Sequence, residues 1–257
     1  MLRLLTTWLK RILYEVQEYT RLQVQTLQGV FSRPFYYHDV VEQLDLIGIG
    51  SLTVVLLTGF FTGAVLALQS GVTLDQFGAR PFVGRLVSAS MIKELGPVLT
   101  GLMLAGRIGS GIAAELGSMV VTDQINALRA LGTDPVRKLV IPRVLAGIFM
   151  TPVLTVIADT VGVLGGWIVA VYQLRVASSL YWTSITEALY LQDAWMGIFK
   201  PFILGYVIVT IGCYVGLRTS GGTQGVGRST TNAVVAASVA VIAVDFFVTR
   251  LMITLLY

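Results

Sequence analysis

Five long apolar runs limit what this chain of 257 residues can fold into. Each run is nearly free of charge, and about 20 apolar residues suffice to cross a hydrocarbon core of roughly 30 Å as a helix. The fourth run is short unless residues 198–202 extend it, with Lys200 directing its ammonium group outward to the interface. The sequence therefore predicts an all-α integral membrane protein with five transmembrane helices. The runs are Leu46–Leu68, Leu95–Leu116, Val144–Val171, Ile203–Leu217 and Ala233–Tyr257.

Composition supports this fold class. The chain is 55% hydrophobic and 12% charged, with a mean hydropathy of +0.79, whereas soluble domains average about 25% charged residues. Five spans leave no room for a separate catalytic module. We therefore expect a single domain, with an interfacial helix and lead-in over residues 1–43 and a five-span bundle over residues 44–257.

The N-terminal stretch 1–30 is predicted to be an amphipathic helix. Lys10 and Arg11 interrupt any apolar core, so the stretch is not a signal peptide. Basic residues between apolar ones, with Trp8 and Tyr14 available at headgroup depth, are typical of a helix that lies in the membrane interface. A helix docked on another subunit is the alternative. The apolar positions are Leu2, Leu5, Leu9, Ile12, Leu13 and Val16.

The distribution of basic residues predicts the orientation. Cytoplasmic loops carry an excess of Lys and Arg. With the N-terminus inside, the inner segments hold eleven such residues and the outer loops three, so we expect a cytoplasmic N-terminus and a periplasmic C-terminus. The inner residues are Arg3, Lys10, Arg11, Arg21, Arg33, Arg129, Arg137, Lys138, Arg143, Arg218 and Arg228. The outer ones are Arg80, Arg85 and Arg175.

Charged side chains inside the apolar stretch 91–117 indicate a functional or structural role. Such side chains are costly in hydrocarbon and normally face a protein interior or an aqueous path. At about 1.5 Å per residue, Glu94 falls at the outer edge of the membrane and Glu115 at the inner edge, where it can join the following loop. The charged residues are Lys93, Glu94, Arg107 and Glu115.

Arg107 falls near the middle of its span. We expect an ion pair with Asp159 or Asp245, which are also central in their spans, and direct contact with a substrate is the alternative. Pro97 has no backbone N–H, so the helical hydrogen bond to the carbonyl of Lys93 is missing and a kink is expected there.

Residues 123–131, between the second and third spans, are predicted to form a short amphipathic helix. Asp123 is placed as N-cap, and Gly132 followed by Pro135 supplies a stop. A helix of this length is not stable alone in water, so it needs a surface, either the bilayer interface or a groove on a partner. Its apolar residues are Ile125, Leu128 and Leu131.

Small residues recur at helical spacing and predict close helix packing. One stripe runs along the second span, and three further spans contain a pair of glycines four positions apart. The stripe consists of Gly106, Gly109, Ser110, Ala113, Ala114 and Gly117, and the pairs are Gly59 and Gly63, Gly162 and Gly166, and Gly212 and Gly216.

Several motifs resemble the MlaE family of ABC-transporter permeases, which includes the permeases of Mce-type lipid transport systems. The runs KELGPVLTGLMLAGRIGSGIAAELG and TDQINALRALGTDPVRKLVIPR carry most of the likeness. GFFTGAVLALQ in the first span, and GVGRSTTNAVV leading to AVDFFVT in the last, extend it over nearly the whole chain.

The resemblance implies a permease subunit of the bacterial inner membrane that moves phospholipids or similar hydrophobic molecules between membranes. The implied partners are a second copy of the chain, cytoplasmic ABC ATPase subunits, a periplasmic MCE-domain protein and, in some systems, a small STAS-like subunit. ATP and Mg would bind the ATPase, with no cofactor on this chain. No catalytic or metal site is expected, since His38 is the only histidine, and no nucleic acid partner is implied.

The resemblance also suggests site residues. The loop helix would be the coupling helix that contacts the ATPase. A lipid pathway is expected at the outer end of the first span and the loop after it. The coupling candidates are Glu115, Asp123, Ile125, Leu128, Leu131 and Asp134, and the lipid-binding candidates are Leu66, Leu74, Phe77 and Glu94.

A proton-coupled secondary transporter is the alternative function, because membrane-embedded carboxylates such as Asp159 and Asp245 are used by such proteins. Five spans do not divide into two equal inverted repeats, which counts against it.

Overall fold

The structure is a computed structural model that describes residues 2–30 and 36–256, without the side chains of residues 2–9, 11, 12 and 256. Within these ranges the chain is helical and has no strand, as the sequence predicts. The α-helices are α1 (Leu2–Val30), α2 (Tyr37–Asp75), α3 (Val83–Ser90), α4 (Gly96–Leu104), α5 (Ser110–Val121), α6 (Gln124–Ala130), α7 (Ile141–Tyr172), α8 (Ser178–Ala188), α9 (Leu191–Leu217) and α10 (Gly222–Leu256). A 3₁₀ turn η1 (Arg80–Phe82) and π-helical turns η2 (Met91–Leu95), η3 (Ala105–Gly109) and η4 (Val136–Val140) join some of them.

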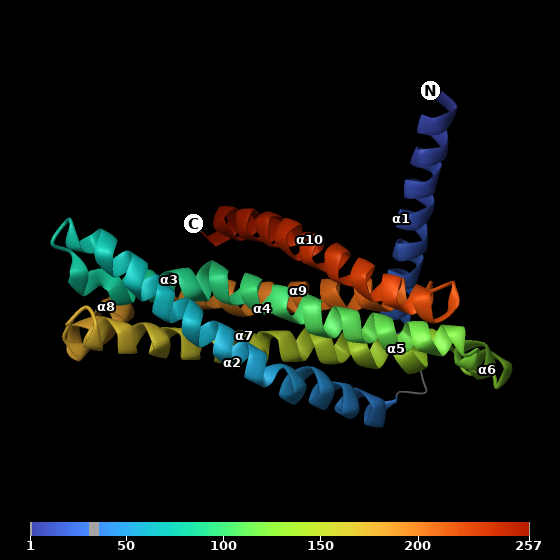
Figure 1. The fold of residues 1–257 in the computed structure, drawn as a ribbon, viewed down its shortest axis with the longest axis horizontal. Helices are drawn as coiled ribbons and strands as arrows, with labels where there is room; N and C mark the ends of the chain where they lie inside the picture. The colour runs from blue at the N-terminus through green and yellow to red at the C-terminus, as the bar shows by residue number, and fades with distance from the viewer. Residues whose placement is uncertain (1, 31–35, 257) are drawn as a thin grey trace.

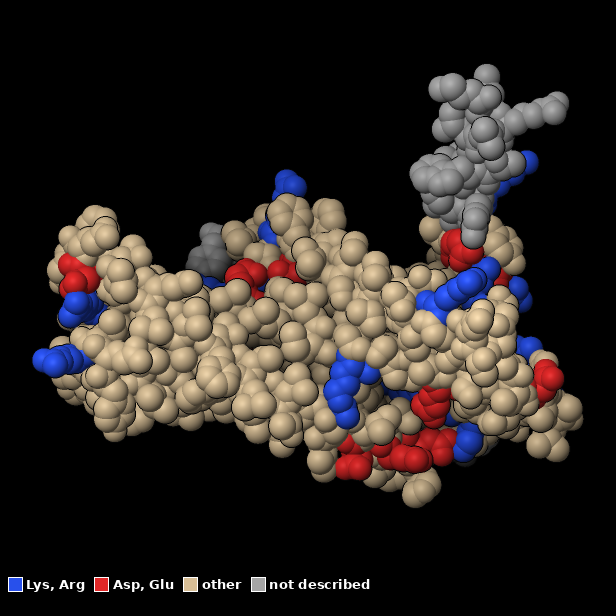
Figure 2. Space-filling model, in the orientation of Figure 1, with Lys and Arg blue, Asp and Glu red and all other residues tan. Residues whose placement is uncertain are grey.

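Five segments of the described chain are long and apolar enough to cross a membrane. They lie side by side as an elongated bundle (Figure 1). The α6 end of the bundle also holds α1 and the loop between α9 and α10, and the α8 end holds the loop after α2 (Figure 1). Uncharged residues dominate the visible length of the bundle (Figure 2). The segments are Tyr37–Asp75, Arg80–Val121, Val136–Tyr172, Leu191–Leu217 and Gly222–Leu255.

The second span is a composite of α3, η2, α4, η3 and α5. π-turns insert an extra residue into the helical repeat and are frequent at functional positions. The two turns fall on the charged positions of the sequence, because η2 contains Lys93 and Glu94 and η3 contains Arg107. The second span therefore changes helical register at Lys93, Glu94 and Arg107.

Glycines bring α2 and α7 into backbone contact. A Cβ on Gly63 would overlap the carbonyl of Gly162, and a Cβ on Gly59 would lie 2.7 Å from the carbonyl oxygen of Ala158. Helices in membranes associate through such close packing, because lipid tails supply no hydrophobic drive. The glycine pairs of the first and third spans thus face each other. Their spacing predicts close packing, but not which helices pair.

The glycines of α9 pack against the second span in the same way. A Cβ on Gly212 would lie 3.0 Å from the carbonyl oxygen of Gly109, and one on Gly216 would lie 3.1 Å from the Cα of Ala113. Only part of the predicted stripe of small residues packs against another helix, because a Cβ on Gly106 would meet open space.

Helix α1 runs roughly across the bundle axis at its α6 end (Figure 1). Its C-terminal half is docked on the rest of the chain: Leu22 and Thr26 are buried, and the hydroxyls of Tyr19 and Thr210 lie 2.9 Å apart. Towards the N-terminus of the same helix, Leu13, Tyr14 and Val16 are exposed. This arrangement fits a helix in the interface plane. The predicted positions Leu2, Leu5, Trp8, Leu9 and Ile12 lie outside the described side chains.

Two features differ from the sequence expectations. Lys200 does not point outward, because it lies within α9, is 0% exposed and is surrounded by carboxylates. Because Glu94 and Asp245 neutralise its charge, the ammonium group of Lys200 is stable without contact with water at the interface. Helix α8 was not anticipated; its Tyr181 is fully buried and donates a hydrogen bond of 2.9 Å to the carbonyl of Val163, which fastens α8 to α7.

Candidate functional site

Five charged residues meet inside the bundle, towards its α8 end, and form what we call the charged cluster. Lys200 is at its centre, with Nζ 2.8 Å from Oε2 of Glu94 and 3.5 Å from Oδ1 of Asp245. Lys200 is the tenth residue of α9, so it lies about 14 Å along the helix from Leu191. The members are Lys93, Glu94, Asp193, Lys200 and Asp245.

Pro97 helps to build this cluster. A proline cannot donate to the carbonyl four residues earlier, so the carbonyl oxygen of Lys93 lacks its usual helical partner. Lys200 supplies the missing hydrogen bond, with Nζ 2.7 Å from that oxygen. The side chain of Lys200 thus joins the break in the second span to α9. The local irregularity was predictable from Pro97, but its partner was not.

A second ion pair extends the cluster to the end of α9. Nζ of Lys93 lies 2.7 Å from Oδ1 of Asp193, which is 0% exposed. Asp193 also accepts the backbone N–H of Tyr190 at 3.2 Å and so caps α9. Buried charges are tolerated when they are paired and hydrogen-bonded. Lys93, Glu94 and Asp245 are among the residues that the sequence indicates, whereas Asp193 and the role of Lys200 are not.

A pocket of about 440 Å³ lies beside the charged cluster. Lys93 and Glu94 contribute charged walls, and Met196 and Ile253 contribute apolar ones. The side chains of Lys93 and Glu94 are 32% and 42% exposed, so both charges remain accessible. Mixed walls of this kind suit a molecule that has both a charged group and a hydrocarbon part.

The other lipid-binding candidates lie elsewhere. Leu66 and Leu74 are half-buried against a second apolar core that includes Val83 and Tyr181. Phe77 follows the end of α2 and is 77% exposed. None of the three lines the pocket beside Glu94. Within this chain, therefore, the structure does not bring the predicted apolar residues and Glu94 together.

Arg107 does not form the predicted ion pair with either aspartate in the described part of the chain. Its guanidinium donates instead to the hydroxyl of Ser51 at 2.7 Å and to the carbonyl of Leu46 at 3.4 Å. Leu46 and Ser51 lie near the start of the apolar run of α2. Arg107 therefore lies on the α6 side of the middle of the bundle. Asp245 pairs with Lys200 instead.

The α6 region shows how the coupling candidates are placed. Gly132 has a φ of +76°, and backbone hydrogen bonds run from Gly132 to Arg129 and from Thr133 to Leu128, each 3.0 Å. This is a Schellman motif, which ends the helix where the sequence predicts. Asp134 then accepts the backbone N–H of Val136 at 2.9 Å and starts the third span.

Asp123 takes the N-cap position of α6, but its side chain makes no capping hydrogen bond. Its backbone is left-handed, with a φ of 58°, and its carboxylate accepts a hydrogen bond of 2.9 Å from the side-chain amide of Asn126. Glu115 binds Arg143 of α7, with a nitrogen–oxygen distance of 2.7 Å, rather than a residue of α6.

The apolar residues of α6 separate into covered and exposed ones. Ile125 is 4% exposed and Leu128 is half-buried, and both pack on the core of this chain. Leu131 is 79% exposed. The bundle itself therefore provides much of the surface that the short helix needs, and Leu131 is the apolar coupling candidate left open to a partner.

Comparison with known proteins gives a consistent result. The profile of the family described as Permease MlaE matches residues 40–251. A probable ABC transporter permease protein of Rickettsia bellii is 41% identical over 241 residues, which cover 94% of this chain and 93% of the relative. The intermembrane phospholipid transport system permease protein MlaE of Haemophilus influenzae is 36% identical, and the match covers 83% of this chain and 82% of the relative. The chloroplastic protein TRIGALACTOSYLDIACYLGLYCEROL 1 of Arabidopsis thaliana is 34% identical, and the match covers 86% of this chain and 63% of the relative.

Proposed function

Because the chain belongs to the MlaE permease family, we propose that it is the membrane-spanning subunit of an ABC transporter for phospholipids or similar hydrophobic molecules. It would reside in a bacterial inner membrane with its α6 end in the cytoplasm. ATP hydrolysis on separate cytoplasmic subunits would drive movement of lipid between membranes. The N-terminus would be cytoplasmic and the C-terminus periplasmic.

The pocket beside the charged cluster is the observation that carries this proposal to the level of residues. Lys93 and Glu94 present one cation and one anion, which can bind the phosphate and the ammonium group of a zwitterionic lipid. Met196 and Ile253 continue the wall with apolar surface for acyl chains. A purely polar solute would leave this apolar surface unused.

The proposed partners correspond to exposed surfaces. The ATPase would contact the α6 end through Leu131 and its neighbours. A second copy of the chain would pack on α10, where large apolar residues 58–63% exposed recur along one face. A periplasmic MCE-domain protein would meet the α8 end, and a STAS-like subunit would bind with the ATPase. The α10 residues are Val235, Val239, Ile242 and Phe246.

Photo-crosslinking in the reconstituted complex tests the lipid pathway. A crosslinking residue at Met196 or Ile253 should capture phospholipid in an ATP-dependent manner, and Leu74 and Phe77 serve as the competing positions. Capture at Leu74 and Phe77 alone would move the pathway to the outer end of the first span. Capture at none of the four positions would contradict lipid transport through this chain.

The driving force separates the proposal from a proton-coupled transporter. Labelled phospholipid should pass between two vesicle populations when ATP is present, and collapse of the pH gradient should leave the rate unchanged. Transport that follows the pH gradient without ATP would favour the alternative, for which Asp159 and Asp245 supply membrane-embedded carboxylates.

A further inference from the structure

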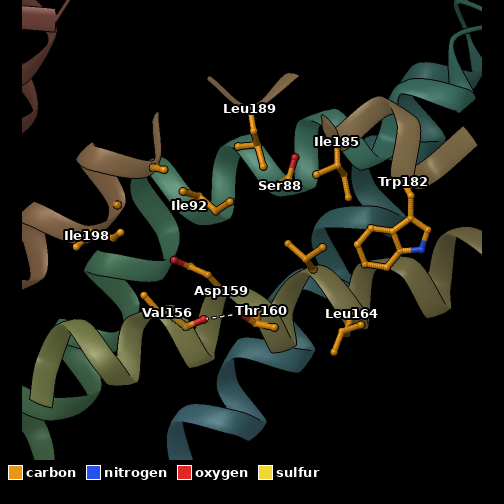
Figure 3. Close-up of a pocket in the computed structure, with 13 residues that line it drawn as sticks. Ser88, Ile92, Val156, Asp159, Thr160, Leu164, Trp182, Ile185, Leu189 and Ile198 are labelled. Carbon is orange, nitrogen blue, oxygen red and sulfur yellow. Dashed lines mark hydrogen bonds between the residues drawn. The ribbon is translucent and has the colours of Figure 1, made fainter. Parts of the chain in front are cut away.

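A second pocket, which we call the α7–α9 groove, lies between α7, α8, α9 and the second span (Figure 3). Its volume is about 320 Å³, within the roughly 300–1,000 Å³ that ligand pockets occupy. Helices α7, α8 and α9 and the end of the second span form its walls. Four large side chains of its lining are 40–46% exposed, namely Val156, Leu164, Trp182 and Ile198.

The groove is separate from the pocket beside the charged cluster. Ile92 and Gly197 line the groove, whereas the adjacent residues Lys93 and Met196 line the other pocket. The second span and α9 therefore present different faces to the two pockets. Nothing in the proposed lipid pathway uses the groove.

Asp159 lies in the wall of this largely apolar groove (Figure 3). It is 8% exposed, and its Oδ1 is buried without a hydrogen-bond partner in the described part of the chain. Oδ1 lies against the backbone of Gly96, which can come so close because glycine has no Cβ. A buried polar group without a partner is costly, so the fold retains an acceptor that no residue around it satisfies.

The other polar groups of the groove do not satisfy Asp159. The hydroxyl of Thr160 donates to the carbonyl of Val156 at 2.7 Å, and that of Ser88 donates to the carbonyl of Arg85 at 3.2 Å. Among the described residues, no Lys or Arg lines the groove. Besides Asp159, Ser88 and Thr160, its lining includes the indole of Trp182, whose N–H is a donor, and apolar side chains.

We propose that the α7–α9 groove binds a neutral lipid whose polar end is a hydroxyl group, such as a long-chain alcohol or a diacylglycerol. The hydroxyl donates to Asp159, and the hydrocarbon part fills the groove towards the membrane. A phosphate would find no cation to neutralise it, and an ammonium group would leave donors unpaired in an apolar wall.

The depth of Asp159 supports a weakly polar ligand. The indole of Trp167 donates to the hydroxyl of Ser178 at 2.9 Å, near the α8 end, where an aromatic ring with a polar group is typical of the membrane interface. Asp159 precedes Trp167 by eight residues on α7 and so lies about 12 Å deeper. A phosphate headgroup at this depth would need a cation, and the described lining of the groove has no Lys or Arg.

Three photoreactive probes with the same hydrocarbon chain test the proposal. They are hexadecanol, hexadecyl phosphate and hexadecane, each with a diazirine on the chain, added to the full-length protein in phosphatidylcholine nanodiscs. At equal mole fraction in the bilayer, the alcohol should label peptides of α7 and α9 at a concentration at least tenfold lower than the alkane. The phosphate should label no better than the alkane.

Two matched pairs of variants locate the binding. Val156→Phe narrows the groove and should reduce labelling by the alcohol at least tenfold, whereas Val153→Phe, on the same exposed side of α7 but outside the groove, should not change it. Asp159→Val should remove the preference for alcohol over alkane. Asp159→Asn keeps an acceptor oxygen, so most of the preference for the alcohol should remain.

Three outcomes would overturn the proposal, two of them measured on the unmodified protein. Equal labelling by alcohol and alkane would mean that Asp159 recognises no hydroxyl. Stronger labelling by the phosphate would assign the groove to phospholipid. Labelling that Val156→Phe leaves unchanged would place the ligand elsewhere on the surface.

Discussion

Nζ of Lys200 lies 2.8 Å from Oε2 of Glu94, and this contact joins α9 to the second span across 106 residues of sequence. The same nitrogen reaches the carbonyl oxygen of Lys93 that Pro97 leaves without a helical partner. One fully buried lysine therefore compensates both a charge and a backbone break. Its removal should affect stability as well as lipid handling.

Lys200→Met should lower the thermal stability of the protein in detergent. The substitution leaves Glu94 and Asp245 without their cation, and breaking a buried pair costs about 3–5 kcal/mol. We expect the lower end, because the side chain of Glu94 is 42% exposed. Arg250→Met removes an exposed cation of α10 and is the control. Equal melting temperatures for the two variants would show that Lys200 has no stabilising role.

Gly63→Ala should destabilise the α2–α7 contact. The added methyl group overlaps the carbonyl of Gly162, so the helices must separate, and overpacking of this kind costs about 1–3 kcal/mol. Gly111→Ala on α5 meets open space and should be neutral or gain up to about 1 kcal/mol from helix propensity. Thermal unfolding in detergent measures the stability of both variants. The prediction fails if Gly111→Ala lowers the melting temperature as much as Gly63→Ala does.

Leu131→Arg should uncouple ATP hydrolysis from transport without loss of folded protein, because this side chain is 79% exposed on the proposed ATPase-facing end. Leu128→Arg should instead reduce the yield of folded permease, since Leu128 packs on the core. The comparison requires purified complex, its ATPase rate and its lipid transport rate. Normal coupling in Leu131→Arg would mean that the ATPase binds another surface.

Alkaline pH should reveal the burial of Tyr181. Burial raises the pKa of its phenol above the ordinary value of about 10. The unfolded chain then ionises first, so the contribution to stability is complete below pH 10 and is lost as the pH rises above it. Tyr181→Phe should show less alkaline loss. At neutral pH it should be less stable by about 1 kcal/mol, because the carbonyl of Val163 loses its hydrogen bond.

Melting temperatures at pH 7 and above pH 10 test this prediction for the protein and for Tyr181→Phe. The other tyrosines contribute equally to both, so the difference between the two proteins isolates residue 181. An identical alkaline loss would show that Tyr181 does not couple ionisation to folding.

Local patterns in the sequence were sufficient to predict the spans and several features of their packing. An uncharged run must become a helix in hydrocarbon, since every backbone group needs a partner there. Glycines at a spacing of four mark close-packed faces, and Gly59 and Gly63 lie on one. The stop at Gly132 and the irregularity at Pro97 follow from single residues, so they too were predictable.

The partners of the membrane-embedded charges were decided only by the tertiary structure. The sequence puts Arg107, Asp159 and Asp245 near the middle of their spans, but it does not state which faces of which helices meet. Rotation and register of the packed helices direct Arg107 to Ser51 and Asp245 to Lys200, and leave Asp159 in a groove. Ion pairing depends on distances of a few ångströms between residues far apart in the chain, so it follows from packing and not from local pattern.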